Sequence, residues 1–306
     1  MCTTIAIRKN GLYFGRNMDI ENHFGERIIH TPRHFLINYH HETDKGGYAI
    51  LGIGAVIDGV PLYADGVNER GLCIAGLNFL YNANYKKSID GAINLAPYEI
   101  SPYFLRSCAT IKEVKELVKD VNVTDTPINP SVPIPYLHFH IADSSESVVL
   151  EPTAGGIKLY DNPHGILTNN PQFPYHISRL PQYEHLENRT LHATFYKNEL
   201  YSLGLGAYGL PGDFSSSSRF LRGEFILKNL CVDDGEEIPS VFRALETLSV
   251  PKGSVLAENE MPHYTLYSCC IDADKIRYYV RSYGDLSVRS VSADSLDRDG
   301  TELSEF

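Results

Sequence analysis

The cysteine at the second position of the chain has the most distinctive chemistry. Met1 precedes it, and removal of an initiator methionine is favoured before a small residue such as Cys2. The product would carry a thiol and an α-amine on one residue, with ordinary pKa values of about 8.5 and about 7.7–8.0. Moving the thiol proton to the amine then costs only about 1 kcal/mol. Cys2 could therefore supply both nucleophile and general base, unless it is merely a small second residue.

Two charged residues on the next segment of chain could assist such a cysteine. Thr3 to Arg8 alternates in polarity, a turn follows, and Leu12 to Asp19 returns, which predicts a β-hairpin. Pairing of these strands brings Arg16 and Asp19 beside Cys2. A carboxylate there could hold the ammonium form of the amine, and a guanidinium could favour the thiolate. The alternative for Arg16 and Asp19 is an exposed ion pair.

The rest of the pattern predicts strands in blocks and helices in blocks, which favours one layered α+β domain over residues 1–306 rather than alternating β/α units. A capping-box pattern at Thr110 and Glu113 predicts a helix start. Two later helices are predicted at Phe220 to Leu230 and Val241 to Leu248. Strands are predicted at Tyr48 to Ile57, Leu62 to Val67, Gly71 to Phe79, Tyr136 to Ala142, Ser147 to Glu151, Gly156 to Tyr160, Gly165 to Asn169, Leu266 to Ile271, Lys275 to Arg281 and Leu286 to Ser290.

Composition limits the classes of partner. The 306 residues are 43% hydrophobic and carry a formal net charge of −11, which argues against nucleic acid or an anionic membrane as partner. Residues Met1 to Asn10 lack the cationic-then-apolar pattern of a secretory signal, so secretion is not expected. The longest nearly uncharged apolar run, Gly46 to Ile57, is too short to cross a bilayer. The six cysteines show no C-x-x-C pair, so most are expected to be buried thiols in a cytoplasmic protein.

Six segments in order, led by Cys2, resemble the choloylglycine hydrolases (bile salt hydrolases and penicillin V acylases) of the N-terminal-nucleophile superfamily. The resemblance runs from Met1 to about Ser292. After Met1-Cys2-Thr3-Thr4, its segments are Phe14 to Ile20, Pro61 to Glu69, Gly71 to Asn78, Leu137 to Phe139, Leu167 to Pro171 and Gly209 to Phe220.

The resemblance implies a role for each matching position. Cys2 is expected to be the nucleophile, with Arg16 and Asp19 as its supporting pair. Asn78 and Asn169 are expected around the oxyanion, where uncharged donors stabilise the developing negative charge. Arg219 is expected to be the positive member of the site. By sequence alone each asparagine also fits a turn or strand end, and Arg219 also fits the protein surface.

The resemblance also implies the fold and the substrate. The fold is expected to be a four-layer αββα sandwich with two antiparallel sheets, and the reaction to be hydrolysis of a glycine- or taurine-conjugated bile acid without metal or organic cofactor. Asparagine at position 78 is typical of bile salt hydrolases, whereas many penicillin acylases have tyrosine there. The source is expected to be a gut bacterium and the assembly a homotetramer. Apolar residues expected in the pocket wall are Phe24, Ile57, Ala64 and Ile134.

The sequence leaves three alternative functions open. Penicillin V or an N-acyl homoserine lactone could be the better substrate, and a non-catalytic steroid-binding protein could retain the fold. Two further patterns are discounted: the glycines from Gly204 to Gly209 precede no helix, as a dinucleotide site would require. His138 and His140 share a strand face, but no third ligand of matching pattern accompanies them, so strand packing is favoured over metal binding.

Overall fold

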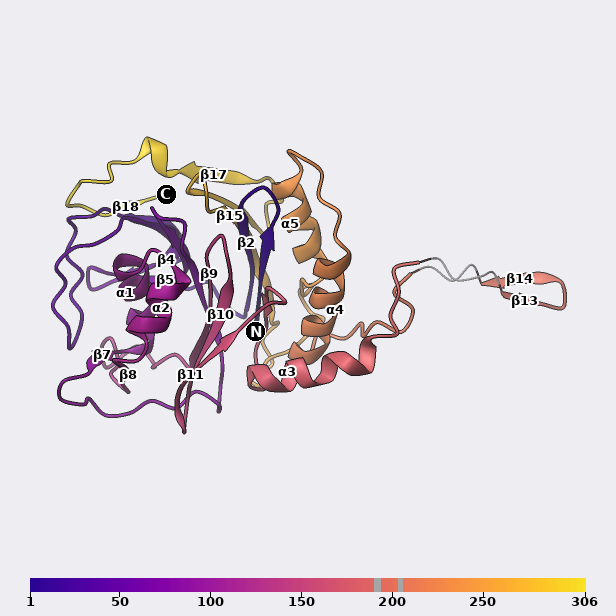
Figure 1. Ribbon diagram of the computed structural model, residues 1–306, viewed down its shortest axis with the longest axis horizontal. Coiled ribbons are helices and arrows are strands. Elements are labelled where there is room, and N and C mark those ends of the chain that lie inside the picture. The colour runs from indigo at the N-terminus through magenta and orange to yellow at the C-terminus, as the bar shows by residue number, and fades with distance from the viewer. Residues whose placement is uncertain (190–193, 203–205) are drawn as a thin grey trace.

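Two antiparallel β-sheets face each other, and helices cover the outer side of each sheet (Figure 1). The structure is a computed structural model that describes residues 1–189, 194–202 and 206–306. From one side to the other, the layers are helices, the six-stranded sheet, the eight-stranded sheet and helices. This arrangement confirms the expected αββα sandwich of the α+β class.

The six-stranded sheet has β1 and β2 near its centre. Its order is β12-β1-β2-β15-β16-β17, and helices α4 and α5 pack on its outer face, with α3 beside α4. The strands are β1 (Cys2–Arg8), β2 (Leu12–Ile20), β12 (Ile166–Leu167), β15 (Tyr264–Asp272), β16 (Arg277–Ser282) and β17 (Arg289–Ser292). The helices are α3 (Phe173–Arg179), α4 (Ser216–Asn229) and α5 (Glu237–Glu246).

The eight-stranded sheet has the order β11-β10-β9-β6-β5-β4-β3-β18. Its strands are β3 (Arg27–Thr31), β4 (Ile50–Ile57), β5 (Val60–Asn68), β6 (Cys73–Asn78), β9 (Leu137–Ala142), β10 (Ser147–Thr153), β11 (Gly156–Asp161) and β18 (Ser304–Glu305). Helices α1 (Ile100–Ser107) and α2 (Ile111–Leu117) lie on its outer side (Figure 1).

Smaller elements complete the fold. Strands β7 (Ile93–Leu95) and β8 (Val121–Val123) form a parallel pair, and β13 (Thr194–Tyr196) pairs with β14 (Glu199–Ser202). The β13–β14 hairpin extends away from the two sheets (Figure 1). Three 3-10 turns are η1 (Pro97–Glu99), η2 (Leu180–Tyr183) and η3 (Ala293–Ser295).

Two apolar cores hold the layers together. The first joins the two sheets and α4 and α5, and it includes Cys2, Phe14 and Phe220. The second lies between the eight-stranded sheet and helices α1 and α2. Both faces of the central strands are therefore covered, so their side chains are buried on both sides and β2 is buried from Leu12 through Asp19. A buried strand of this kind can carry polar side chains only where they find partners.

The first hairpin forms as predicted, and several other element boundaries differ. β1 pairs with β2 in a register that sets Cys2 against Met18 and Thr4 against Arg16. Helix α4 begins four residues earlier than expected because the Ser215 hydroxyl caps it by accepting from the Ser218 amide at 3.3 Å. Helix α5 begins before Pro239, which the first turn tolerates since its amides lack helical acceptors.

Two predicted strands need correction, and some elements were not predicted. The strand expected at Gly165 to Asn169 is limited to Ile166–Leu167, since Thr168 and Asn169 turn to hydrogen-bond Ser216. The strand expected at Leu286 to Ser290 lies at Arg289–Ser292 (β17), and a short strand β18 follows it at Ser304–Glu305. Strand β3 and helices α1 and α3 were not expected.

Two expectations from the sequence concern the state of the cysteines and the presence of a membrane-spanning segment. All six cysteines are free, and five of them are buried while Cys231 is exposed. Among the described residues, none of the helices has the length and apolar character needed to cross a membrane.

Candidate active site

Cys2 begins β1 and lies between the two sheets with only 4% of its surface exposed. Its sulfur is 3.3 Å from Nη2 of Arg16, which donates toward it, and 3.7 Å from the sulfur of Met18. Both neighbours come from β2, so the hairpin brings this part of the site together. A guanidinium at this distance stabilises a thiolate over a thiol.

Arg16 is itself buried and reaches from one sheet to the other. Its Nη2 donates to the Gly76 carbonyl at 2.8 Å, and its Nη1 donates to the Ala64 carbonyl and lies 3.3 Å from Oδ2 of Asp65. Burial alone would lower the pKa of Arg16, but the charges of Cys2, Tyr267 and Asp65 outweigh it and raise the pKa above its ordinary value. Arg16 is therefore a fixed positive charge beside the sulfur.

Asn169 connects the nucleophile candidate to two other predicted site residues. Its Oδ1 accepts from the Cys2 backbone nitrogen at 2.7 Å and from Nη2 of Arg219 at 2.9 Å. Its Nδ2 donates to the Asn78 carbonyl at 2.8 Å. The Ser216 hydroxyl accepts from the Asn169 amide at 2.8 Å, so the start of α4 holds this residue in place.

Arg219 lies in the first turn of α4 and is fully buried. Its Nη1 donates to the Cys2 carbonyl at 2.6 Å and to the Thr3 hydroxyl, and lies 3.9 Å from Oδ2 of Asp19. Burial lowers the pKa of Arg219, and the charges of Asp19 and Cys2 oppose this shift. The surface alternative for Arg219 is therefore wrong: its charge faces the start of β1.

Asp19 lies next to the chain terminus. Its Oδ1 accepts from the Thr265 hydroxyl at 2.6 Å, whereas its buried Oδ2 has no hydrogen-bond partner among the described residues. Its backbone pairs with Met1 in both directions, at 2.7 and 3.0 Å. The Met1 amine also contacts Nε2 of His263 at 2.6 Å, and burial lowers the pKa of this amine. The exposed ion pair considered for Arg16 and Asp19 is absent.

Asn78 ends β6 and has an exposed side chain. Its carbonyl accepts from Asn169, and its Oδ1 accepts from the Leu80 amide at 3.1 Å. The structure thus brings all six predicted catalytic positions into one connected arrangement around Cys2.

The four expected pocket residues divide into two pairs. Phe24 and Ala64 are half-buried and pack against the core that contains Cys2. Ile57, at the end of β4, and Ile134, before β9, are also half-buried, but the contacts described for them do not connect them to Cys2. Their role in a pocket wall stays a prediction.

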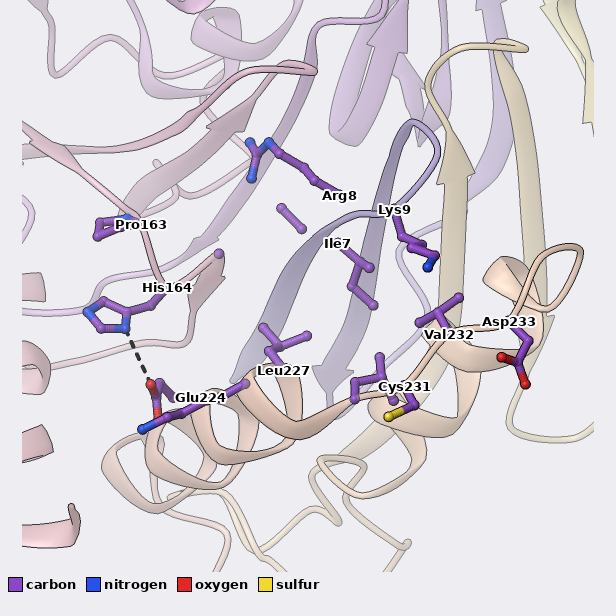
Figure 2. Close-up of a pocket in the computed structure, with 14 residues that line it drawn as sticks. Ile7, Arg8, Lys9, Pro163, His164, Glu224, Leu227, Cys231, Val232 and Asp233 are labelled. Carbon is purple, nitrogen blue, oxygen red and sulfur yellow. Dashed lines mark ion pairs between the residues drawn. The ribbon is translucent and has the colours of Figure 1, made fainter. Parts of the chain in front are cut away.

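A separate surface cleft of about 760 Å³ lies at the other end of β1 (Figure 2). It is lined by the end of β1, the loop before β12 and the end of α4, and it contains a His164–Glu224 pair at 3.5 Å. Arg8 lines this cleft and is the last residue of β1, whereas Cys2 is the first. The cleft contains none of the predicted catalytic residues.

The histidines of β9 have protein partners. His138 lies 3.0 Å from the Thr168 carbonyl and 3.3 Å from Glu151. His140 lies 2.9 Å from the Thr4 hydroxyl, and burial lowers its pKa to about 3. Among residues 1–189, 194–202 and 206–306 no cluster of ligand types suits a metal ion.

Sequence reasoning missed several residues that contact the site. They are Asp65, Ser216, His263 and Thr265. Asp65 alone had a signal, since a carboxylate within an otherwise apolar strand needs a buried partner. The others are hydroxyl and imidazole groups in ordinary contexts, and only the fold reveals their position.

Facing antiparallel sheets between helical layers, with a cysteine at the start of a central strand, define the class of N-terminal-nucleophile hydrolases. The family described as linear amide C–N hydrolases, choloylglycine hydrolase family, matches residues 2–306. The chain belongs to this family.

Similar proteins cover nearly the whole chain. The bile salt hydrolase/transferase of Lactiplantibacillus plantarum is 39% identical over 309 residues, which cover 99% of this chain and 95% of the relative. The bile salt hydrolase/transferase of Clostridium perfringens is 35% identical over 317 residues, with 100% and 96% covered. The crystal structure of a variant of conjugated bile acid hydrolase from Clostridium perfringens superposes with a TM-score of 0.93 at 33% identity, covering 100% of this chain and 96% of that chain.

Proposed function

We propose that this protein hydrolyses the amide bond of glycine- or taurine-conjugated bile acids, with Cys2 as nucleophile after removal of Met1. The observation that carries the proposal is the contact of Cys2 with Arg16 and Asn169: the guanidinium lies 3.3 Å from the sulfur while the amide oxygen lies 2.7 Å from the nitrogen of the same residue. The bile salt hydrolases among its relatives, 39% and 35% identical, support the substrate class.

The first chemical step is attack of the Cys2 sulfur on the substrate carbonyl carbon. The thiol proton passes to the α-amine of Cys2, and the resulting ammonium gives a proton to the leaving nitrogen as the C–N bond breaks. The products of this step are an S-acyl thioester on Cys2 and free glycine or taurine. Water then attacks the thioester while the α-amine of Cys2 takes a proton from it; the C–S bond breaks, the sulfur regains that proton, and the bile acid is released.

The polar groups around residue 2 suit this proton transfer. With Met1 in place, the nitrogen of Cys2 is a peptide nitrogen with one hydrogen, which Asn169 accepts. An ammonium has two further hydrogens, and the unpartnered Oδ2 of Asp19 is a buried acceptor nearby, since the Asp19 backbone pairs with Met1. We infer that Asn169 and Asp19 orient the amine, and that Arg219 fixes the Cys2 carbonyl on its other side.

The oxyanion formed during attack needs hydrogen-bond donors, and uncharged amide groups can supply them without forming a salt bridge beforehand. We propose the side-chain Nδ2 groups of Asn169 and Asn78 as these donors: each carries two hydrogens, and the bond from Asn169 to the Asn78 carbonyl uses one of those on Asn169. Losing one such donor typically costs about 3–4 kcal/mol of transition-state stabilisation. The wall of the acyl pocket is proposed to include Phe24, Ile57, Ala64 and Ile134, which suit an apolar steroid.

The experiment that tests the substrate is a paired kinetic comparison. Purified protein without Met1 is assayed with glycocholate, taurocholate, penicillin V and an N-acyl homoserine lactone, and the released amine or ring-opened product is quantified. The proposal predicts the highest kcat/KM for the two bile-acid conjugates. A higher kcat/KM for penicillin V or the lactone contradicts it, and saturable binding without amine release identifies a non-catalytic steroid-binding protein.

We further propose that residues 1–306 form one domain and that the protein is a cytoplasmic homotetramer. The observation that supports self-association is that the β13–β14 hairpin extends away from the two sheets (Figure 1), while its residue Leu200 is 52% exposed. Light scattering after size exclusion tests the tetramer, and a monomer contradicts it. Cell fractionation tests the location, and a single unfolding transition tests the domain.

A further inference from the structure

A buried carboxylate, Asp65, shares the guanidinium of Arg16 with Cys2. Nη2 of Arg16 faces the Cys2 sulfur at 3.3 Å, and Nη1 of the same guanidinium lies 3.3 Å from Oδ2 of Asp65. Asp65 belongs to β5 in the eight-stranded sheet, whereas Arg16 belongs to β2 in the six-stranded sheet. One positive charge therefore lies between two acidic groups from opposite layers.

Asp65 is held on its far side by two tyrosines of the six-stranded sheet. The Tyr267 hydroxyl donates to Oδ2 at 3.0 Å and the Tyr278 hydroxyl donates to Oδ1, while the Cys269 sulfur lies 3.6 Å from Oδ1. Burial raises the pKa of Tyr267 and of Tyr278 well above the ordinary value, so both hydroxyls keep their protons. Both carboxylate oxygens thus have donors, although Asp65 is completely buried.

Backbone carbonyls alone could orient Arg16, so the carboxylate adds something else. The guanidinium already donates to the carbonyls of Ala64 and Gly76. Asp65 adds a negative charge, which compensates the buried Arg16 cation and weakens the electrostatic attraction between Arg16 and the Cys2 thiolate. A thiolate that is stabilised too strongly is a weaker nucleophile, because nucleophilicity falls together with basicity.

We propose that Asp65 is a positioning residue that holds Arg16 against Cys2 and takes up part of its charge, so that the thiolate forms while remaining nucleophilic. This inference rests on the proposed function of Cys2 as the attacking group. In this proposal Tyr267 and Tyr278 support Asp65, because their hydroxyls hydrogen-bond the carboxylate and so keep it ionised and in place. The polar cluster between the sheets then sets the reactivity of the site.

Several charged groups surround Cys2, and all of them except Asp65 stay constant in the test. They are Arg16 and Asp19 from β2, Arg219 from α4, Asp65 from β5, the terminal amine, and His263 before β15.

The test replaces Asp65 by asparagine, which keeps the shape and one acceptor oxygen but removes the charge. The protein carries Cys231→Ser, because Cys231 is the exposed free thiol. Alkylation of Cys2 by iodoacetamide is followed across pH and located by peptide mass. For Asp65→Asn we expect the midpoint pH to fall by about one unit. The plateau rate constant should fall about threefold.

Asp143→Asn is the matched control, because Asp143 is a buried carboxylate that accepts from the Ile111 amide at 2.7 Å, at the start of α2. Its midpoint should equal that of the parent protein. A midpoint for Asp65→Asn that stays unchanged or rises overturns the proposal. The acid limb of kcat/KM should move with the alkylation midpoint, which a merely structural role of Asp65 would not produce.

Tyr278→Phe keeps the test decisive if Asp65→Asn does not fold. This variant retains the carboxylate and removes one of its hydrogen-bond donors. Asp65 then neutralises more of the Arg16 charge, so the midpoint pH of Cys2 alkylation should rise. A midpoint that is constant or falls contradicts the proposal. Alkylation requires no substrate, so absence of amide hydrolysis in the parent protein would overturn the proposed function while this test still decides the role of Asp65.

Discussion

The side-chain oxygen of Asn169 accepts a hydrogen bond at 2.7 Å from the backbone nitrogen of Cys2, 167 residues earlier in the chain. The same oxygen accepts from Arg219, so one amide group orients the residue proposed to attack and the cation beside it. The proposed mechanism depends on this contact, because the nitrogen that Asn169 holds becomes the base once Met1 is removed.

Replacing Cys2 by serine should abolish most turnover without loss of binding. The hydroxyl is nearly isosteric with the thiol and can still accept from Arg16, but it is far harder to deprotonate. We expect kcat for glycocholate to fall at least about a thousandfold, or ~4 kcal/mol, with little change in substrate affinity. Cys231→Ser is the control and should keep full activity, since Cys231 is exposed. Near-parental turnover by Cys2→Ser would show that another group attacks.

Replacing Asn169 by alanine should reduce kcat more than it changes KM. The variant loses a proposed oxyanion donor and the acceptor that holds the Cys2 nitrogen, so kcat should fall by about 10²–10³. Asn122→Ala controls for loss of a buried amide, because Asn122 donates to the Lys87 carbonyl at 2.9 Å in the β8 region. Equal losses of activity in the two variants would contradict a specific role for Asn169.

Protein that retains Met1 should be folded and inactive. Met1 continues the pairing of β1 with β2 through two hydrogen bonds to Asp19, so its presence fits the fold. The nitrogen of Cys2 is then an amide and cannot act as a base. Hydrolysis should be at least about a hundredfold slower than for protein without Met1, with the two forms identified by intact mass. Equal rates would remove the amine from the mechanism.

Stability should fall in mild acid because two buried histidines must stay neutral. Burial lowers the pKa of His140 to about 3 and that of His176 to about 4. In the unfolded chain each of these imidazoles binds its proton near the ordinary pKa of about 6.5. The contribution of the two neutral histidines to stability is therefore complete above about pH 6.5. It is lost as the pH falls from there toward the pKa values of the folded protein. As the pH falls from about 7.5 to about 5, each of the two histidines should lower the free energy of unfolding by about 2 kcal/mol.

Urea unfolding of His140→Gln at both pH values measures this contribution. The difference between the two pH values should shrink by about 2 kcal/mol relative to the parent. His34→Gln, at an exposed position, is the control and should keep the full difference. A His140→Gln variant with the parental difference would show that His140 does not titrate on unfolding.

Local pairing made part of the site predictable from sequence. A hairpin with a short turn sets its own register, so Arg16 could be expected near Cys2, and Thr4 indeed pairs with Arg16. The roles of Asn78, Asn169 and Arg219 came from the family resemblance, because contacts across 217 residues follow from packing of whole layers. Asp65 was missed for the same reason: its partners lie in the facing sheet.

Helix α1 and the end of the strand before Asn169 were predicted wrongly because local sequence preference does not decide them. Helix α1 is short and contains Pro102 in its first turn, which weakens the helical signal although Ile100, Phe104 and Leu105 form a buried face. The strand leading to Asn169 ends early because its last residues bond to α4 instead of to β1. In both cases tertiary contacts outweigh local preference.

The most direct measurement of the central claim is mass analysis of the acyl-enzyme. Protein without Met1 is mixed with excess glycocholate, quenched in acid within the first turnovers and digested. The account predicts that the cholyl group is found as a thioester on the N-terminal peptide that begins with Cys2. Turnover with the acyl group on any other residue, or on protein that still carries Met1, would contradict it.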